Sequence, residues 1–507
     1  MLAHLALAVL LAVRPAPVRP AVHAAPDPRA VVNDAIAAMQ GGASLRELRS
    51  LRLTGVEHEF MLGNAERAEG PWRTSYWRFS ELRDVGAPVL RRTEWTLTPD
   101  GESPVSRTYV LADSVLAVES RGRQAGLSHG QYEDWMDRVD ASPARALLLA
   151  SASAGLRWDR AVTRFGVTSD VVSFPWRNGR MRVEVSRESR LPVAVEVFRA
   201  YPDNFRWAPF GDVTMRFDYV DWTVQPTLRG AWWPMQEKVS FNGQPYRDVT
   251  YGSIALAADP APADSFAVSD SARAQFAAAS ALNFSRFTFG ARGAPTELRP
   301  GIVRVPDFWS MTLVKQPDGV VVFEAHISAS YLHAVLAEAG RRWPGSKVKA
   351  IVMTSDPWAH LGGVREAMAL GIPIYVNARS VPFLESLARA PHTLEPDALA
   401  RSGRAPTLVG VRGKVTIGAG PTRIELYPVG GAYAERMTMA YFPEYRLLYG
   451  ADLVFPNRGP DGKFAPGFDE TPATDLRRAV ARERLAVDTV FCVQNYGPFA
   501  WGAFSGH

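Results

Sequence analysis

The stretch KVKAIVMTSDPWAHLGGVREAMALGIPIYV, residues 347–376, changes its hydrophobic period from one short segment to the next. The apolar run KVKAIVM predicts a buried strand, because it is short, continuous and rich in β-branched residues. HLGGVREAMALG predicts a short helix, and IPIYVN predicts a second strand. A strand followed by a helix and another strand is typical of a mixed α/β domain.

The mixed pattern extends outward from this stretch in both directions. Upstream, GIVRVPDFWSMTLVKQPDGVVVFEAHIS predicts two or three strands with a Pro-Asp-Gly turn, and SASYLHAVLAEAGRRWPG predicts an amphipathic helix. Downstream, a run of further strands is predicted in KVTIGAG, TRIELYPVGG, RMTMAYFPEYRLLYGADLVF and DTVFCVQNYGP. We therefore expect an α/β domain over residues 296–507.

In order and spacing, these segments resemble the metallo-β-lactamase superfamily. The resemblance rests on DGVVVFEA, on the stretch 347–376 and on RMTMAYFPEYRLLYGADLVFP, and it covers about residues 296–504. It implies a four-layer αββα sandwich whose metal ions lie at one edge, between the two sheets. The family signature at that edge is HxHxDH followed by Gly-Gly. Its side chains hold one or two zinc ions, which activate a water molecule for hydrolysis.

Most ligands of that signature are replaced in this chain. His360 matches the last histidine of the motif, Gly362 and Gly363 follow it as expected, and Asp452 in YGADL matches a bridging aspartate. The remaining ligand positions are occupied by Ser355, Pro357, Ala359, Gly430 or Gly431, and one of Gln494, Asn495 and Tyr496. Two protein ligands do not hold zinc tightly, because zinc sites use three or four.

Two interpretations of His360 and Asp452 stay open. In the first, they form a buried hydrogen-bonded pair that needs no ion, and the chain has no cofactor. In the second, Glu324 and Asp356 join them in a rearranged site for one divalent metal ion, and this oxygen-rich set suits a harder cation than zinc. His326 follows Glu324 closely and could also reach the cavity, although a lone histidine is more often a solvated or satisfied residue.

Residues 29–268 follow a different pattern. Residues 29–50 predict an amphipathic helix, a Gly-Gly break and a helical turn, and alternating polar and apolar runs then predict a large antiparallel sheet with one solvated face. The segment 132–155 interrupts this alternation and predicts helix. The opening helix with Gly-Gly before LRLTG, the segment AWWPMQEKVSFNG and the closing ADSFAV resemble the LolA-like lipoprotein-carrier family. That resemblance implies an antiparallel β-rich half-barrel closed by helices.

Aromatic residues are dense in this half of the chain. The tryptophans concerned are Trp72, Trp77, Trp95, Trp135, Trp207, Trp222, Trp232 and Trp233. They either pack on the concave face of a curved sheet, where aromatic residues are generally favoured, or line an apolar cavity that holds a lipid or another small molecule.

The N-terminus predicts export. LALAVLLAV is an apolar core of signal-peptide length, too short to span a bilayer, and VHA followed by Ala25 resembles an A-x-A cleavage site. We therefore interpret residues 1–25 as a signal peptide and expect a periplasmic or extracellular protein that can associate with the cell envelope. No later segment predicts a transmembrane helix. Residues 269–295, rich in Ala, Ser and Gly, are predicted to link the two domains.

Composition excludes several classes of function. The net charge is +5, but Lys and Arg are scattered among acidic residues, so no nucleic-acid groove is expected. The single cysteine, Cys492, rules out an intramolecular disulfide and CxxC motifs, and its apolar surroundings predict a buried thiol. The sequence has no GxSxG, no P-loop and no GxGxxG after a strand.

Three hypotheses follow from these patterns. The chain is an exported metallo-β-lactamase-fold protein with a degenerate metal centre that serves as a binding or scaffold protein. Alternatively, it is a hydrolase with a rearranged mononuclear metal site, or it carries a lipid or lipoprotein in its N-terminal domain. Fold alone does not decide among them, since function depends on the site.

Overall fold

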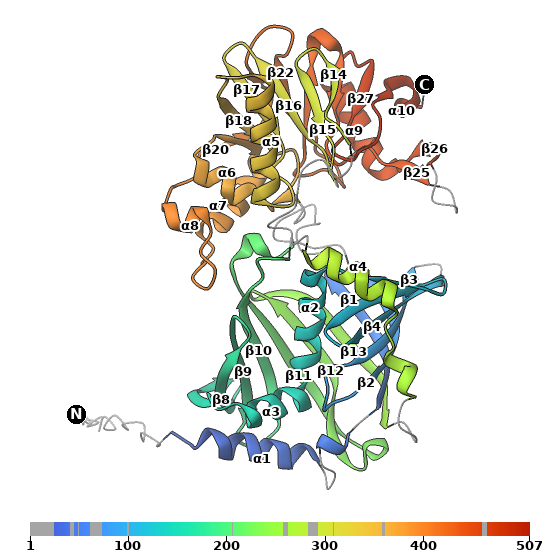
Figure 1. Cartoon of the computed structure of the whole chain (residues 1–507), viewed down its shortest axis with the longest axis vertical. Coiled ribbons are helices and arrows are strands. Elements are labelled where there is room, and N and C mark those ends of the chain that lie inside the picture. Colours follow the sequence, from blue (N-terminus) through green and yellow to red (C-terminus); the bar gives the residue numbers. More distant parts are fainter. Residues whose placement is uncertain are drawn as a thin grey trace, which may run out of the picture.

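The computed structural model has an N-terminal lobe built on one large sheet and a C-terminal lobe built on two smaller sheets (Figure 1). This confirms a mixed α/β protein with a large antiparallel sheet. The structure describes residues 25–40, 45–48, 50–60, 74–98, 101–204, 206–256, 262–281, 293–307, 309–356, 360–458 and 464–506. Residues 1–24 of the predicted signal peptide, the Gly-Gly break at 41–42, Trp72, Pro357 and Ala359 lie outside the described residues.

The N-terminal lobe is organised around a 13-stranded antiparallel sheet. Its order is β6-β5-β4-β3-β2-β1-β13-β12-β11-β10-β9-β8-β7, so two meanders meet where β1 pairs with β13. The strands are β1 (Leu51–Phe60), β2 (Thr74–Arg83), β3 (Leu90–Thr98), β4 (Gly101–Ala112), β5 (Val115–Ser120), β6 (Arg123–Gly126), β7 (Arg157–Arg164), β8 (Val167–Trp176), β9 (Gly179–Ser186), β10 (Pro192–Ala200), β11 (Asp212–Gln225), β12 (Ala231–Phe241) and β13 (Gln244–Leu256). The alternation predicted from the sequence is visible in β1, where Leu51 and Leu53 are buried and Arg52 and Thr54 are exposed.

Two helices lie inside the curve of this sheet (Figure 1). α2 (His129–Asp140) and α3 (Pro143–Ala152) connect β6 to β7, which are the two edge strands, so the connection has to cross the sheet from edge to edge. Ser128 and Gln131 form a capping box at the start of α2, and Pro143 opens α3. α1 (Pro28–Gln40) contacts α3 and the strands β8, β9 and β12.

The described tryptophans of this lobe are largely packed. Trp135, Trp207 and Trp233 are buried, and Trp77, Trp95, Trp222 and Trp232 are half-buried. Trp207 and Trp233 belong to one core cluster with residues of α1, α3 and the sheet. This arrangement agrees with the packing interpretation of the aromatic residues.

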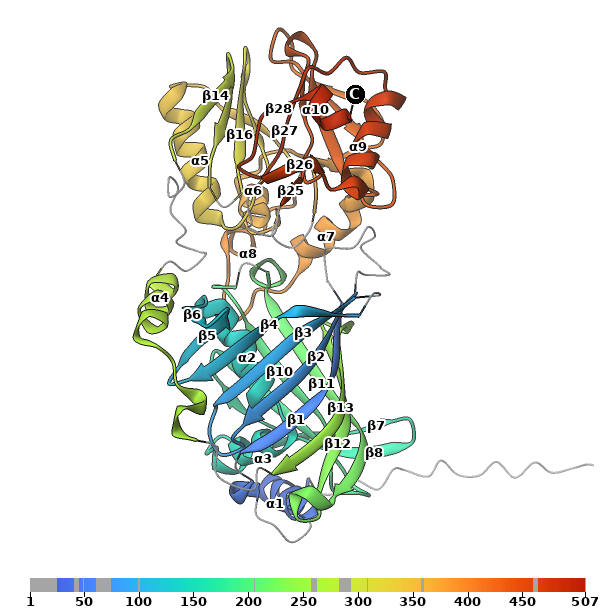
Figure 2. The same cartoon turned by 90° about the vertical axis from the view of Figure 1, so that its right-hand side faces the viewer.

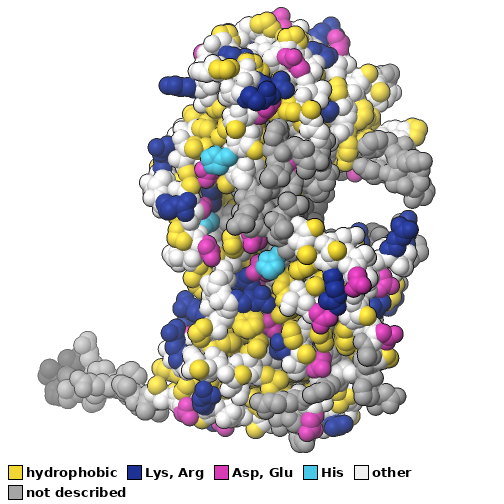
Figure 3. Space-filling model, in the orientation of Figure 1, with side chains coloured by type: hydrophobic (Ala, Val, Ile, Leu, Met, Phe, Trp, Pro, Cys, Tyr) yellow, Lys and Arg dark blue, Asp and Glu magenta, His cyan; other side chains and the backbone are white. Residues whose placement is uncertain are grey.

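A network of buried charges lies between the sheet and α2. Glu57 of β1 is 2% exposed, and its carboxylate pairs with Arg92 at 2.5 Å, with Arg138 at 2.7 Å and with Arg247 at 3.8 Å. Burial opposes ionisation, but the three guanidinium groups outweigh it and lower the pKa of Glu57 to about 2. On the surface, by contrast, Lys and Arg side chains are interspersed with Asp and Glu (Figure 3).

Glu59, on the same strand as Glu57, provides a pH-dependent prediction. Burial, reinforced by the charges of Glu57 and Asp134, raises the pKa of Glu59 to about 7. The folded state therefore retains a proton that the unfolded chain releases near pH 4.5, and stability falls as pH rises through this window. We expect Glu59→Gln to raise the free energy of unfolding by about 2 kcal/mol at pH 8, allowing for partial exposure, and to leave it unchanged at pH 4. Urea unfolding of both proteins at the two pH values measures this difference, and an equal effect at both would contradict it.

The segment predicted as a linker begins with a structured helix. The 3-10 helix η4 (Ala263–Phe266) precedes α4 (Asp270–Ala281), which contacts β5 and β6. Gln275 of α4 accepts a hydrogen bond from the amide of Gly126, at 3.1 Å, so the helix covers the β6 edge of the large sheet. Residues 282–292 lie outside the described part of the chain.

The C-terminal lobe contains a seven-stranded and a six-stranded sheet, with orders β14-β15-β16-β17-β18-β19-β20 and β21-β22-β23-β24-β27-β28. The first comprises β14 (Thr296–Arg299), β15 (Ile302–Val305), β16 (Met311–Gln316), β17 (Gly319–Phe323), β18 (Val348–Val352), β19 (Ile374–Asn377) and β20 (Leu408–Val411). The second comprises β21 (Val415–Ile417), β22 (Ile424–Pro428), β23 (Thr438–Phe442), β24 (Leu447–Tyr449), β27 (Thr489–Phe491) and β28 (Phe499–Ala500). A separate ribbon joins β25 (Pro456–Arg458) to β26 (Phe464–Phe468). From β17 to β20 neighbouring strands are parallel, because helices connect them.

The two sheets of this lobe pack against each other. Val321, Phe323 and Val352 of the first sheet share one buried core with Leu426 and Phe442 of the second. The helices of the lobe are α5 (Ala329–Arg342), α6 (Val364–Leu370), α7 (Val381–Arg389), α8 (Ala398–Ser402), α9 (Glu470–Arg482) and α10 (Trp501–Ser505). Residues of α5 to α8 pack on the first sheet, and residues of α9 and α10 pack on the second together with the buried Cys492.

The lobes contact each other where the start of β11 meets the turn after α7 (Figure 2), and beside this turn Phe210 packs on Phe383 of α7. The amide of Asp212, which begins β11, donates to the carbonyl of Pro391 at 2.7 Å, and the Asp212 carboxylate accepts from the amides of Thr393 and Leu394 at 2.9 and 3.1 Å. A small cavity of about 170 Å³ beside this contact is lined by residues of both lobes, among them Tyr201 and His392. Within the described residues, no helix combines the length and apolarity needed to cross a membrane.

Candidate metal centre

The candidate site lies where two parallel strands end. Glu324 follows β17 directly, and Thr354, Ser355 and Asp356 follow β18, the neighbouring strand. The carboxyl ends of parallel strands meet at one edge of a sheet, which is where sites generally form in such sheets. The structure places Glu324 beside Thr354 and His360, two residues of the stretch in which the resemblance expects the metal site.

The turn after β17 has an unusual backbone. Glu324 and Ile327 have φ values of 74° and 64°, in the left-handed region that non-glycine residues rarely adopt. Such conformations cost about 1–3 kcal/mol each and occur preferentially at functional sites. Here they accompany a reversal of the chain that places Glu324 and His326 beside the same histidine, His360.

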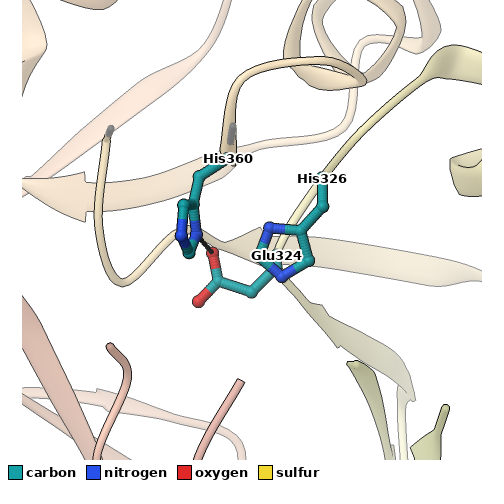
Figure 4. Close-up of side chains that lie close together, drawn as sticks. All are labelled: Glu324, His326 and His360. Carbon is teal, nitrogen blue, oxygen red and sulfur yellow. Dashed lines mark ion pairs between the residues drawn. The ribbon is translucent and has the colours of Figure 1, made fainter. Parts of the chain in front are cut away.

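Glu324, His326 and His360 form a buried cluster (Figure 4). One ligand atom of each residue lies within 4.8 Å of those of the other two. Glu324 and His326 are fully buried, and His360 is 2% exposed. Two imidazoles and a carboxylate converging in this way are a donor set that divalent transition metals accept.

The Glu324 carboxylate is held by the second strand and by the second sheet. Its Oε1 atom accepts hydrogen bonds from the Thr354 amide at 3.2 Å, from the Tyr449 hydroxyl at 3.2 Å and from the Thr354 hydroxyl. The other oxygen, Oε2, lies 3.9 Å from Nδ1 of His360. Oε1 therefore accepts most of the hydrogen bonds, whereas Oε2, which the Thr354 amide reaches at 3.4 Å, faces the cluster.

His360 lies between two carboxylates. Its Nε2 atom is 3.7 Å from Oδ2 of Asp452, its Nδ1 is 3.1 Å from the Ser355 hydroxyl, and its ring stacks on Trp309 at 5.8 Å between centroids. Burial favours the neutral ring, but the nearby carboxylates of Asp452 and Glu324 outweigh it and raise the pKa of His360 to about 9. Without an ion, the ring is therefore a cation at neutral pH.

His326 completes the cluster. Its ring meets that of His360 edge-on, with 4.6 Å between centroids. Both ring nitrogens are buried, and among the described residues neither makes a well-formed hydrogen bond, although the backbone of Ser310 lies close enough to affect the ring. Burial and the neighbouring His360 cation lower the pKa of His326 well below its usual value, so the ring is neutral and can offer a lone pair. A buried polar group without a well-formed hydrogen bond is costly and calls for an explanation.

Asp356, which the sequence placed in the ligand set, lies outside the cluster. Its Oδ1 atom pairs with Arg436 at 2.8 Å, and both side chains are buried. Burial raises the pKa of Asp356, although the Arg436 charge opposes this shift. Arg436 is therefore the partner that draws this carboxylate away from His360.

Asp452 lies beside the cluster and belongs to its outer layer. Its Oδ1 accepts a hydrogen bond from the amide of Gln494, one of the residues at the expected position of the last family ligand. Ala451, just before it, has a φ of 52°. With its other oxygen near Nε2 of His360, Asp452 orients that ring in the way carboxylates orient metal-binding histidines.

The other positions where the family has ligands serve different contacts. Gly430 and Gly431 line an open cleft of about 670 Å³ that also contains Arg379 and Arg412, and no member of the cluster lines it. Asn495 donates to the carbonyl of Asp307 and accepts from Ser310 at 2.7 Å. A dinuclear site therefore does not fit the described residues, whereas one ion fits the three converging donors.

The sequence indicates that His326 can reach the cavity but does not place it among the predicted ligands. The available signal was its position two residues after Glu324 at the end of a predicted strand. In an extended chain, residues two apart face the same side. The position of the His326 ring depends on the left-handed backbone at Glu324 and Ile327. Neither position is a glycine or asparagine, the residue types from which a left-handed conformation is usually predicted.

Comparisons with known proteins show only weak similarity, and only to solved structures. No known family model matches the chain, and no curated protein matches it. Among solved structures, the inverting sec-alkylsulfatase Pisa1 from Pseudomonas sp. has 15% identity and a TM-score of 0.29, over 42% of this chain and 39% of that one. A metallo-β-lactamase from Erythrobacter litoralis has 16% identity and a TM-score of 0.31, over 42% of this chain and 92% of that one. DIM-1 metallo-β-lactamase has 13% identity and a TM-score of 0.32, over 42% of this chain and 94% of that one. This chain thus spans well under half the length of the alkylsulfatase, and TM-scores near 0.3 say nothing about its activity.

Proposed function

We propose that the C-terminal lobe is a metallo-β-lactamase-like domain that binds one divalent metal ion through Glu324, His326 and His360, as the metal site of a hydrolase. The observation that carries the proposal is His326, whose two buried ring nitrogens make no well-formed hydrogen bond and lie beside two other potential ligands. The packing of two sheets between outer helices supports the αββα arrangement that the sequence implies.

The roles of the protein groups follow from their contacts. A bound divalent ion supplies Lewis-acid chemistry and activation of water, as required for hydrolysis of an ester, thioester, amide or phosphate. Thr354 and Tyr449 fix the orientation of the Glu324 carboxylate. Asp452, whose side chain is 16% exposed, holds a proton on Nε2 of His360 and is the member of the site nearest to solvent. Trp309 covers one face of the His360 ring and excludes water from it.

A metal-free binding or scaffold protein is the second candidate. It is favoured by the contacts of Glu324, His360 and Asp452, which already satisfy one another and their neighbours without an ion. In this case the fold tolerates the free-energy cost of burying the His326 ring nitrogens without well-formed hydrogen bonds. Export and envelope association remain predictions of the N-terminal sequence. A LolA-like half-barrel that carries a lipid receives less support, because Trp207 and Trp233 are packed in the core of that lobe.

Metal binding separates the two candidates. The mature, tag-free protein, purified without chelators, is incubated with Zn²⁺ or Mn²⁺, and its metal content and affinity are measured by mass spectrometry and calorimetry. We expect about one ion per chain, and a loss of affinity of about 10²-fold or more in both His326→Ala and His360→Ala, because two donors do not hold an ion tightly.

Two variants serve as controls for this experiment. His333→Ala removes an exposed histidine that pairs with Glu366 at 2.9 Å and should bind metal like the wild type. Asp356→Asn alters a predicted ligand that the structure pairs with Arg436, and it should also retain the ion. Wild-type protein that binds no metal would favour the scaffold. Metal binding lost in Asp356→Asn but kept in His326→Ala would contradict the assigned ligand set.

A further inference from the structure

The hairpin formed by β7 and β8 has an unusual tip. Arg164 pairs with Val167, so Phe165 and Gly166 form a two-residue turn, with φ values of 50° and 81°. Turns of this mirror-image type favour Asn-Gly or Asp-Gly, because both central residues have positive φ. A phenylalanine at the first position is therefore unfavourable for the backbone. Its side chain is also fully exposed, at 106% of the reference area.

The apolar surface continues from this tip onto the sheet. Val167 and Val220 are 40% and 37% exposed. Together with Phe165, Val193 and Tyr219, they line a groove of about 490 Å³ beside the hairpin. Single exposed apolar residues need no explanation, but a clustered apolar surface around a projecting tip marks an interaction site. Figure 2 shows the hairpin extending away from the rest of the lobe.

Basic side chains surround this apolar surface. Arg164 and Lys238 line the groove, and Arg160 lies further along the exposed strand β7. The groove also contains two carboxylates, Glu184 and Asp218, and Arg216 pairs with both, at 2.9 and 2.8 Å. Glu184 also lies 3.6 Å from Arg164, and Asp218 lies opposite Lys238 in the strand register. Neither Arg160 nor Lys238 has an ion-pair partner in the described part of the chain. An apolar tip with a basic surround matches a partner that is apolar inside and anionic at its surface.

A second copy of this chain does not fit the same surface. β7 is the uncovered edge of the large sheet, since α4 covers the opposite edge, β6. If two β7 strands paired antiparallel along their full length, Arg157 of one copy would face Arg164 of the other. Like charges placed directly opposite each other destabilise strand pairing.

We propose that the β7–β8 hairpin docks the N-terminal lobe onto an anionic lipid bilayer. Phe165 and Val167 enter the interfacial region, where aromatic side chains are favoured, and Arg160, Arg164 and Lys238 contact the lipid phosphates. This function is independent of the metal site, which lies in the other lobe. It gives a physical reason for a phenylalanine at a position where backbone and solvation both disfavour it.

The test uses the full mature chain and cosedimentation with lipid vesicles. Vesicles of phosphatidylcholine alone are compared with vesicles containing an equal amount of phosphatidylglycerol. We expect binding to the anionic vesicles that weakens with added salt. Phe165→Asn should reduce it by about tenfold or more, from the burial of one aromatic side chain. Lys238→Glu should reduce it by about fivefold or more, from the reversal of one charge near the surface.

The variants are chosen so that misfolding cannot imitate the result. Phe165→Asn creates an Asn-Gly turn that suits the backbone of the hairpin better than the natural residue, so the fold is preserved. Leu370→Ser is the matched control, because Leu370 is 40% exposed but lies in the C-terminal lobe, and it should bind like the wild type. Absence of binding to anionic vesicles, or wild-type binding by Phe165→Asn, would overturn the proposal. So would a concentration-dependent dimer that Phe165→Asn abolishes, since the surface would then bind a second copy.

Discussion

Replacement of Glu57 by alanine is expected to destabilise the N-terminal lobe by about 3–5 kcal/mol, because it leaves buried positive charge uncompensated. Both carboxylate oxygens of Glu57 accept from Arg138 at 2.7 Å, and Arg92 lies 2.5 Å from one of them. Arg92 and Arg247 keep other carboxylates, Glu81 at 3.2 Å and Glu237 at 2.9 Å. Arg138 relies most on Glu57 for charge compensation. The free-energy cost of leaving Arg138 buried and unpaired therefore dominates the loss of stability.

Chemical unfolding followed by tryptophan fluorescence measures this change, with the two lobes fitted as separate transitions. Glu119→Ala is the matched control, since Glu119 pairs with Arg91 at a partly exposed site and should contribute less than about 1 kcal/mol. Adding Arg138→Met to Glu57→Ala should recover part of the loss, because it removes the unpaired charge and keeps the packing. A Glu57→Ala protein as stable as the Glu119→Ala protein would show that the network does not stabilise the fold.

Gly362→Ala is expected to disrupt the candidate metal centre without touching any ligand. A Cβ atom at Gly362 would lie 2.0 Å from the carbonyl oxygen of Ile327 and 2.2 Å from its carbonyl carbon. Such contacts force the backbone to move, and the segment that moves adjoins His326. We expect metal affinity to fall by about 10²-fold and the free energy of unfolding of this lobe to fall by about 2–3 kcal/mol.

Two glycine substitutions calibrate this result. Gly340→Ala, in α5, adds a Cβ with no atom within 4 Å and should stabilise the helix slightly, by less than about 1 kcal/mol. Gly363→Ala meets the carbonyl oxygens of Ser328 and Ala325 at 3.0 and 3.1 Å and should have an intermediate effect. Calorimetry with the metal and urea unfolding report affinity and stability separately. Unchanged metal affinity in Gly362→Ala would contradict the dependence of the site on the turn after β17.

Local periodicity determined the secondary structure and much of its order. Alternation with period two over residues 51–256 requires strands with one buried face, and continuous apolar runs such as GVVVF and KAIVM require strands buried on both faces. These features depend on near neighbours in the chain, so a single sequence carries them.

Long-range pairing was decided only by the tertiary structure. The meeting of β1 with β13, which joins the two meanders, and the course of α2 and α3 between the outer strands depend on segments far apart in the sequence. The candidate ligand cluster in the structure differs from the predicted set because it also depends on residues far apart in the sequence. Arg436, distant in sequence, pairs with Asp356 and draws it out of the site.

His326 illustrates the remaining limit. Its identity and its distance from Glu324 are visible in the sequence, but its place beside His360 depends on two left-handed residues that surrounding packing holds in a costly conformation. Non-glycine residues rarely adopt the left-handed conformation. A prediction based on local sequence alone therefore does not place His326 beside His360. The sequence by itself determined most of the strands, whereas the grouping of Glu324 with His360 came from the family resemblance. Only the tertiary structure brings His326 beside His360 and pairs Asp356 with Arg436. The physical reason is that packing holds the strained backbone after β17 and brings together residues far apart in the sequence.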